Sequence, residues 1–181
     1  MKTEEALQLL DKKIHNSRLK KHMLAVESCM KHLARYFKED EEKWKIAGLL
    51  HDIDYEETQN EPEKHAIIGA EILIENGVNK DIVDAVLAHA DKGPRESLIS
   101  KALYSVDPLT GLIVASALMH PDKKLKSLTV DFVMRRFKEK RFAMGANREQ
   151  IKACEEMNIS LEEFIKICLN AMKEISDQLG L

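Results

Sequence analysis

The sequence contains few of the features that mark a disulfide-stabilised or thiolate-metal protein. It has only three cysteines, Cys29, Cys154 and Cys168, which are far apart and form no CxxC pair. Such spacing predicts neither a disulfide framework nor a zinc site built from thiolates. We therefore interpret the cysteines as reduced, semi-buried residues that pack as small apolar groups.

Glycine, proline and aromatic residues are also scarce. The 181 residues include 7 glycines and 4 prolines, and aromatic residues make up 5% of the chain. This composition favours helices joined by short turns over a sheet protein rich in turns. We predict an all-α fold, a compact helical bundle that forms a single domain over residues 1–181.

The chain has no large excess of charge of either sign. Its 28 basic and 31 acidic residues give a net charge of −3, so no global positive field would attract a nucleic acid polymer or a membrane. The N-terminal residues are partly acidic where a secretory signal would be apolar, and the longest apolar stretch lies around Leu112–Met119. We expect a soluble, cytoplasmic protein, and its oligomeric state stays open.

Apolar residues recur every three or four positions along most of the chain, which is the pattern of amphipathic helices. Because proline disfavours helical geometry in the preceding residue, we expect a break or kink at Asp107-Pro108. Two closing helices should begin at Asn147 and Ser160, which resemble the first residues of capping boxes. The other expected helices are Thr3 to about His15, Leu19–Phe37, Glu41–Leu50, roughly Glu63–Asn76, Lys80 to just before Gly93-Pro94, and Ser97 to Met119.

Six residues of metal-binding type lie in helical, apolar contexts, far apart in the chain. Because they lie on or beside different predicted helices, the interior of a bundle is where they can meet. Imidazole and carboxylate together suit iron, manganese, cobalt, nickel or zinc, and six ligands exceed what one catalytic ion normally takes from protein. We therefore predict two divalent ions with Asp52 as the bridge. The six candidates are His22, His51, Asp52, His65, His89 and Asp107.

The same residues carry a family resemblance. The order His22, His51-Asp52, Asp107 resembles the H…HD…D signature of the HD-domain phosphohydrolase superfamily, and the GLLHDI segment at 48–53 is similar to its core motif. The resemblance covers about residues 18–120 and leaves 121–181 as a C-terminal helical extension. Residues 102–112 and 138–148 also resemble a branch of predicted HD hydrolases without a known substrate.

The resemblance implies how the ligands divide between the ions. The first ion would be bound by His22, His51, Asp52 and Asp107, and the second by Asp52, His65 and His89. The resemblance also implies that the protein is a phosphohydrolase, which uses metal-activated water to cleave a phosphate ester or anhydride. We expect its substrate to be a small phosphorylated molecule of nucleotide type.

Other residues are candidates for supporting roles. Asp54 stands where many members of the superfamily have glycine, so it is either a base behind the ligands or a turn residue. Asp52, Asp54 and Lys92 are our candidate catalytic residues. A later basic segment could contact substrate phosphate, although charge runs are usually solvated. Its candidates are Arg135, Arg136, Lys140 and Arg141.

Two other functions fit the same ligand set. The chain could be a regulatory domain that holds a metal or nucleotide without turning it over. It could also be a di-iron oxygenase, because some members of the superfamily oxidise their substrates. His15, His32 and His120 lie outside the ligand pattern, and we interpret them as surface or structural residues.

Overall fold

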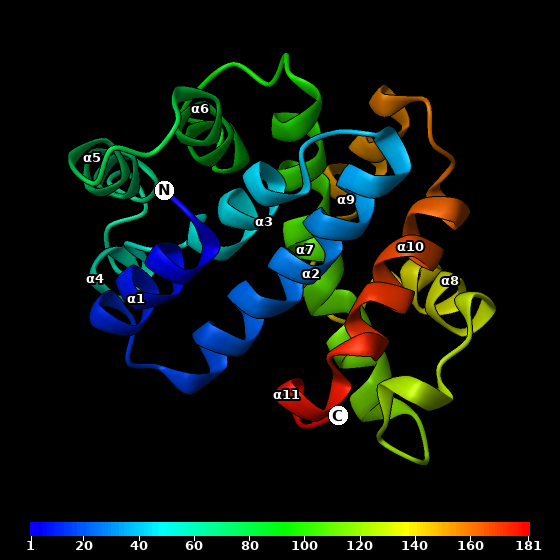
Figure 1. The fold of residues 1–181 in the computed structure, drawn as a ribbon. Helices are drawn as coiled ribbons and strands as arrows, with labels where there is room; N and C mark the ends of the chain where they lie inside the picture. The colour runs from blue at the N-terminus through cyan, green and yellow to red at the C-terminus, as the bar shows by residue number, and fades with distance from the viewer.

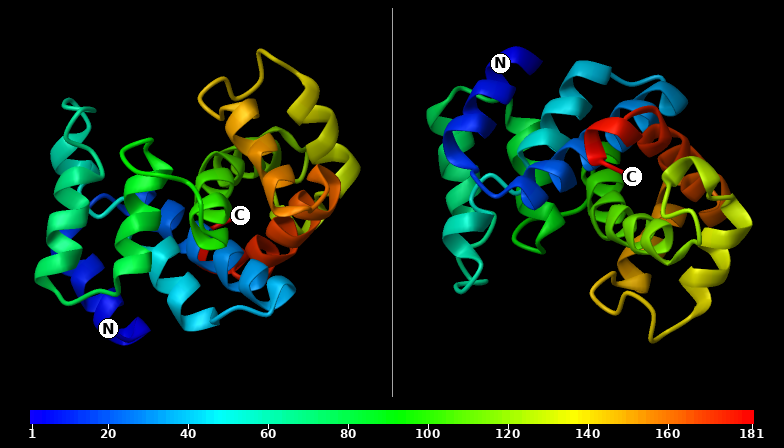
Figure 2. Two further views of the ribbon diagram at one scale, coloured as in Figure 1. Left: turned by 90° about the horizontal axis from the view of Figure 1, so that it is seen from above. Right: turned by 90° about the horizontal axis from the view of Figure 1, so that it is seen from below.

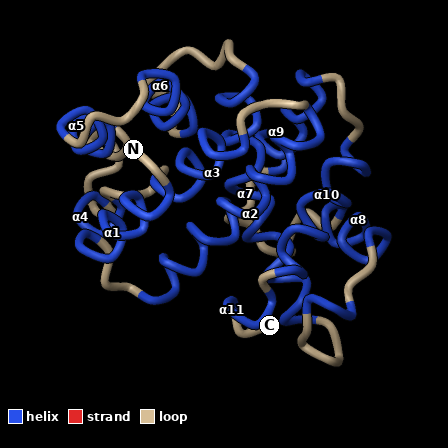
Figure 3. The backbone as a smooth tube through the Cα atoms, in the orientation of Figure 1, coloured by secondary structure: helices blue, strands red, loops and turns tan.

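Two long helices, α2 (Ser17–Phe37) and α7 (Leu98–Met119), form the centre of the fold and pack against each other. The computed structural model describes all 181 residues, and Figure 3 shows helices, turns and no strand. The all-α prediction is therefore confirmed.

Shorter helices cover the central pair on two sides (Figures 1 and 2). One group comes from the N-terminal half: α1 (Thr3–Lys13), α3 (Glu41–Leu50), α4 (Tyr55–Thr58), α5 (Ile67–Glu75) and α6 (Lys80–His89). The rest of the chain adds 3₁₀ turns at Leu125–Ser127 and Ala153–Met157 and the helices α8 (Val130–Lys138), α9 (Arg148–Lys152), α10 (Leu161–Glu174) and α11 (Ser176–Leu179).

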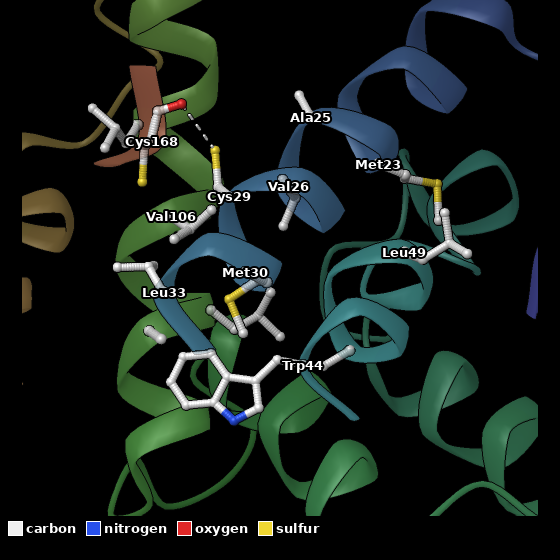
Figure 4. Packing of buried hydrophobic residues seen from close by; sticks show 14 of the residues in the cluster. Met23, Ala25, Val26, Cys29, Met30, Leu33, Trp44, Leu49, Val106 and Cys168 are labelled. Atoms are coloured by element: carbon white, nitrogen blue, oxygen red, sulfur yellow. Dashed lines mark hydrogen bonds between the residues drawn. The ribbon is translucent and has the colours of Figure 1, made fainter. Parts of the chain in front are cut away.

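One hydrophobic core runs from Ala6 on α1 to Leu179 on α11. Figure 4 shows part of it, where the buried ring of Trp44 lies beside side chains of α2. The three cysteines are free and buried, and the thiol of Cys29 donates a hydrogen bond to the carbonyl of Cys168 at 3.5 Å. They pack as apolar residues in the core, as their spacing led us to expect.

Gly48 allows α2 and α3 to approach closely. A Cβ atom at position 48 would lie 2.8 Å from Cα of Glu27, closer than any side chain can come to a backbone. The contact therefore requires glycine on α3. It brings His22 on α2 next to His51 at the end of α3.

Several helix ends differ from the prediction. The N-cap of α1 is Lys2 rather than Thr3, because the Thr3 hydroxyl donates to Glu42 at 2.7 Å, and the helix ends at Lys13. The helix expected from Glu63 begins only at Ile67. Ala66, just before it, has a left-handed backbone with φ 66°, so residues 62–66 form turns. This local geometry depends on tertiary contacts and has no signal in the apolar spacing.

The sequence predicts a break or kink at Asp107-Pro108, but the helix does not break there, and α7 continues through Pro108 to Met119. Across the proline, the carbonyl of Asp107 accepts a hydrogen bond from the Thr110 hydroxyl at 2.9 Å. Packing of α7 against α2, α6, α8 and α9 stabilises the helix along its length. Tertiary packing thus outweighs the local preference of proline.

The same helix is long and apolar enough to span a membrane by length and composition alone. However, 56% of its most apolar window is buried inside the fold, and the central helix of a bundle passes the same test. We therefore interpret α7 as a core helix.

Candidate metal centre

The six predicted ligands come together at one place in the bundle. His22 projects from α2, and His51 and Asp52 lie directly after the last residue of α3. The other three come from the turn before α5, from the last residue of α6 and from the middle of α7, and they are His65, His89 and Asp107.

On one side of Asp52 lies a group formed by His22, His51 and Asp107. The Nε2 atoms of His22 and His51 are 3.2 Å apart, and Nε2 of His22 lies 3.1 Å from Oδ1 of Asp107. Oδ2 of Asp52 faces this group, at 3.5 Å from Nε2 of His51 and 3.6 Å from Nε2 of His22.

The other oxygen of Asp52 faces the remaining two imidazoles. Oδ1 lies 3.5 Å from Nε2 of His65 and 3.5 Å from Nε2 of His89. The two oxygens of one carboxylate are thus each flanked by a different pair of imidazole nitrogens. This arrangement is suited to a carboxylate that bridges two cations.

All four imidazoles are held through their outer nitrogen, Nδ1. His22 Nδ1 lies 3.2 Å from the hydroxyl of Thr110, whose own proton is donated to a carbonyl. The partners fix the tautomer, with the proton on Nδ1 and the lone pair of Nε2 facing the centre. The other three acceptors are the carbonyl of Gly48 for His51, the carbonyl of Val86 for His89 and the carboxylate of Asp54 for His65.

Charge in the centre shifts the pKa values of its members. Burial by itself would lower the pKa of His51, but the charge of Asp52 and the hydrogen bond with Asp107 raise it to about 9. Burial would raise the pKa of Asp52, but His51 and His89 lower it to about 2. In the absence of a cation, a proton on His51 therefore balances the carboxylates. A bound metal ion would take the place of that proton.

The chemistry of the site fits a divalent metal. Nε2 of His89 is buried without any hydrogen-bond partner, which costs free energy unless another group uses its lone pair. Two ligand atoms that each lie about 2.1 Å from the same ion are about 3–3.4 Å apart. The shortest distances between nitrogen and oxygen atoms of different side chains in the centre are close to this range. Two sets of side chains could hold an ion: His22, His51 and Asp107, and His51, Asp52 and His89.

Asp54 lies behind the ligands and holds His65 in place. Its side chain is fully buried, with Oδ1 3.0 Å from Nδ1 of His65. Its other oxygen, Oδ2, accepts the backbone N–H of Gly69 at 2.9 Å. A Cβ atom at position 69 would lie 3.3 Å from this carboxyl group, so glycine there leaves room for it. The structure thus places Asp54 as the partner of a ligand, in contact with the centre through His65.

The other predicted site residues are not brought to the metal ligands. Lys92 is exposed and its side chain makes no ion pair or hydrogen bond. Arg136 pairs with Glu139 at 2.8 Å, and Arg135 borders a surface hollow between α8 and α10 that none of the six residues lines. Lys140 and Arg141 are exposed. Their contact with phosphate stays a prediction.

A cleft beside His22 and Asp107 opens the centre to solvent, and a loop that includes residues 143–146 forms one wall of it. Ala143, Gly145 and Ala146 lie across this cleft from Asp107. The loop is fastened by the partly buried guanidinium of Arg148, which donates to several backbone carbonyls. These belong to Arg136, Phe137, Glu139, Phe142, Ala143 and Ala146.

Comparison with known proteins agrees with this geometry. The HD-domain family profile matches residues 19–126. Ribonuclease Y of Oleidesulfovibrio alaskensis is 34% identical over 90 residues, which are 50% of this chain and 17% of that protein. Ribonuclease Y of Lawsonia intracellularis is 28% identical over 163 residues, 88% of this chain and 31% of that protein.

The chain therefore spans about a third or less of the length of these curated relatives. No solved structure matches it. The profile covers more than half of the chain and includes all six residues of the centre. The chain belongs to the HD-domain family.

Proposed function

We propose that this protein is a metal-dependent phosphohydrolase that cleaves a phosphate ester or anhydride of a small, nucleotide-like molecule. The position of the Asp52 carboxylate carries the proposal, because its two oxygens face two separate pairs of imidazole nitrogens. Membership in the HD family and the ribonuclease names of the relatives support hydrolysis of a phosphorus–oxygen bond.

We infer two divalent ions, with Asp52 as their shared ligand. His22, His51 and Asp107 would complete the first site, and His65 and His89 the second. A bound divalent ion supplies Lewis acidity, which lowers the pKa of water towards neutrality and draws charge from phosphoryl oxygens. The protein orients the imidazoles that would bind the ions. Asp54 fixes the tautomer of His65, and Thr110 fixes that of His22.

The charge of the centre favours an anionic substrate. Asp52 and Asp107 contribute two negative charges and the four neutral imidazoles contribute none, so two divalent ions leave the centre positive. This local attraction can capture phosphate although the chain as a whole carries −3. We infer a small phosphorylated substrate and a cytoplasmic location, which the three unpaired, buried thiols support.

A substrate screen with the metal-loaded protein tests the proposal. The substrates are nucleoside monophosphates and triphosphates, dinucleoside polyphosphates, cyclic dinucleotides and a short oligoribonucleotide. We expect turnover of at least one of them, and His51→Ala and Asp52→Ala should abolish it. His15→Ala is a matched control, because His15 is exposed and outside the centre.

Other results of this screen would contradict the proposal or indicate a different function. Turnover that is unchanged in both His51→Ala and Asp52→Ala would contradict metal-dependent hydrolysis at this centre. Tight nucleotide binding without turnover would indicate a regulatory domain. Oxygen consumption by the reduced iron form would indicate an oxygenase.

A further inference from the structure

A second cavity, about 350 Å³ in volume, opens beside His22 between α2, α7 and the C-terminal residues. His22, Thr110 and Gly111 lie where this cavity borders the metal centre. Its volume is at the lower end of the roughly 300–1,000 Å³ of small-molecule sites. Apolar side chains form much of the lining: Ala25, Val114, Leu118, Leu179 and Leu181.

Two cations from α2 border the same cavity. Lys21 is already engaged, because its ammonium donates to the carbonyl of Leu179 at 2.9 Å and fastens α11 to α2. Arg18 is exposed and makes no ion pair or side-chain hydrogen bond. The cavity thus combines an apolar interior with one unpaired cation at its edge.

The cavity differs from the cleft beside Asp107, although both contain His22 and Gly111. The cleft is lined largely by small residues, with His22 and the Asp107 carboxylate, and it offers less apolar surface than the cavity. Transfer of an uncharged organic group from water into the apolar cavity is therefore more favourable in free energy than its transfer into the cleft. The phosphate, in contrast, is attracted to the metal ligands.

We propose that the apolar cavity binds the organic group of the substrate, an uncharged ring system of about the size of a nucleobase. The phosphate then lies on the other side of His22, against the metal ligands, and Arg18 attracts it from the cavity edge. This inference rests on the proposed function and narrows its substrate class to compact organic phosphates that carry one uncharged ring system.

Gly111 offers a way to fill the cavity without disturbing the fold. A Cβ atom there would meet nothing within 4 Å, so the side chain of Gly111→Met extends into open space. Gly145→Met is the matched control, because Gly145 also meets nothing within 4 Å but lines only the cleft. Gly111→Ala separates the effect of volume from the effect of losing a glycine in α7.

The test is equilibrium binding by calorimetry to the metal-loaded protein, with inorganic phosphate and phenylphosphonate as probes. Phenylphosphonate carries the apolar ring and is not hydrolysed. We expect the wild-type protein to bind phenylphosphonate at least about tenfold more tightly than phosphate. Gly111→Met should remove this difference. Because Gly111 lines the cleft as well as the cavity, the decisive comparison is with Gly145→Met, which fills the cleft alone and should retain the difference, as should Gly111→Ala.

Three results would overturn the inference: equal or no binding of the two probes by the wild type, a difference that survives in Gly111→Met, or a difference that is lost in Gly145→Met. These results concern only the place of the organic group. The proposed function fails separately, when His51→Ala and Asp52→Ala leave turnover unchanged.

Discussion

Asp54 and His65 form a buried pair in which Nδ1 of the imidazole donates to Oδ1 of the carboxylate at 3.0 Å. The second oxygen of Asp54 accepts the N–H of Gly69, so the carboxylate has a donor on each side. Such outer hydrogen bonds orient a ligand imidazole and raise its basicity.

We expect Asp54→Asn to weaken metal binding at His65 by about 10–100-fold, the usual effect of losing an outer partner. An amide has one accepting oxygen and cannot satisfy both donors. If its oxygen turns to Gly69, its NH₂ faces His65 and favours the tautomer with a proton on Nε2. Metal content after dialysis and calorimetric titration measure the loss.

Asp84→Asn is the control for this substitution, since Asp84 pairs with Lys80 on the surface of α6. Full metal content and unchanged affinity in Asp54→Asn would show that the carboxylate does not orient His65.

Gly48→Ala should strongly destabilise the protein. Its Cβ would lie 2.8 Å from the backbone of Glu27, so α2 and α3 must move apart. We expect a loss of about 3 kcal/mol in the free energy of unfolding, at the upper end for overpacking. Urea denaturation measures it, and metal affinity should fall as well because His22 separates from His51.

Gly111→Ala is the contrasting substitution on α7. A Cβ atom added at this position would have no neighbour within 4 Å, so only the helix propensity changes. We expect the free energy of unfolding to increase by about 0.5–1 kcal/mol. Equal effects of the two substitutions would contradict the close contact at Gly48.

Arg148→Ala should release the loop that borders the metal cleft. The guanidinium donates to carbonyls of α8 and of residues 139–146, and these acceptors would lose their partners. We expect a loss of about 2–4 kcal/mol in the free energy of unfolding and faster hydrogen exchange in residues 139–147. Arg35→Ala is the control, because Arg35 pairs with Glu41 on the surface, where solvent screens the pair and little stability should be lost. Unchanged exchange in Arg148→Ala would contradict this role.

Metal affinity should increase with pH until about pH 9. The raised pKa of His51, about 9, means that the metal-free centre holds a proton that a cation must displace. Below that pKa, one competing proton weakens binding about tenfold for each unit of pH, and above it the competition ends. Calorimetry in buffers of different ionisation enthalpy should show protons released at pH 7.5. Affinity that is constant between pH 6 and 9 would contradict this.

That the residues of the candidate metal centre come together could be predicted, because their signals are local. The GLLHDI segment identifies His51 and Asp52, and the apolar spacing places His22 and His89 on helix faces. For Asp54 the sequence left two interpretations open, a base behind the ligands or a turn residue. Its hydrogen bonds with His65 and with the N–H of Gly69 depend on how α5 packs, which has no local signal. The partners of Arg148 depend in the same way on how the loop folds back. Pro108 indicated a break or kink, and the helix does not break there because packing around α7 decides whether it continues.

The geometry of the candidate metal centre ties distant parts of the chain to one another. His22, Asp52, His65, His89 and Asp107 enter it from segments that are separate in sequence, so unfolding any of these segments would remove a candidate ligand. A cation that binds only the assembled bundle therefore stabilises it in proportion to the logarithm of its free concentration. Metal supply would set how long this protein survives heat and proteolysis as well as whether it can react.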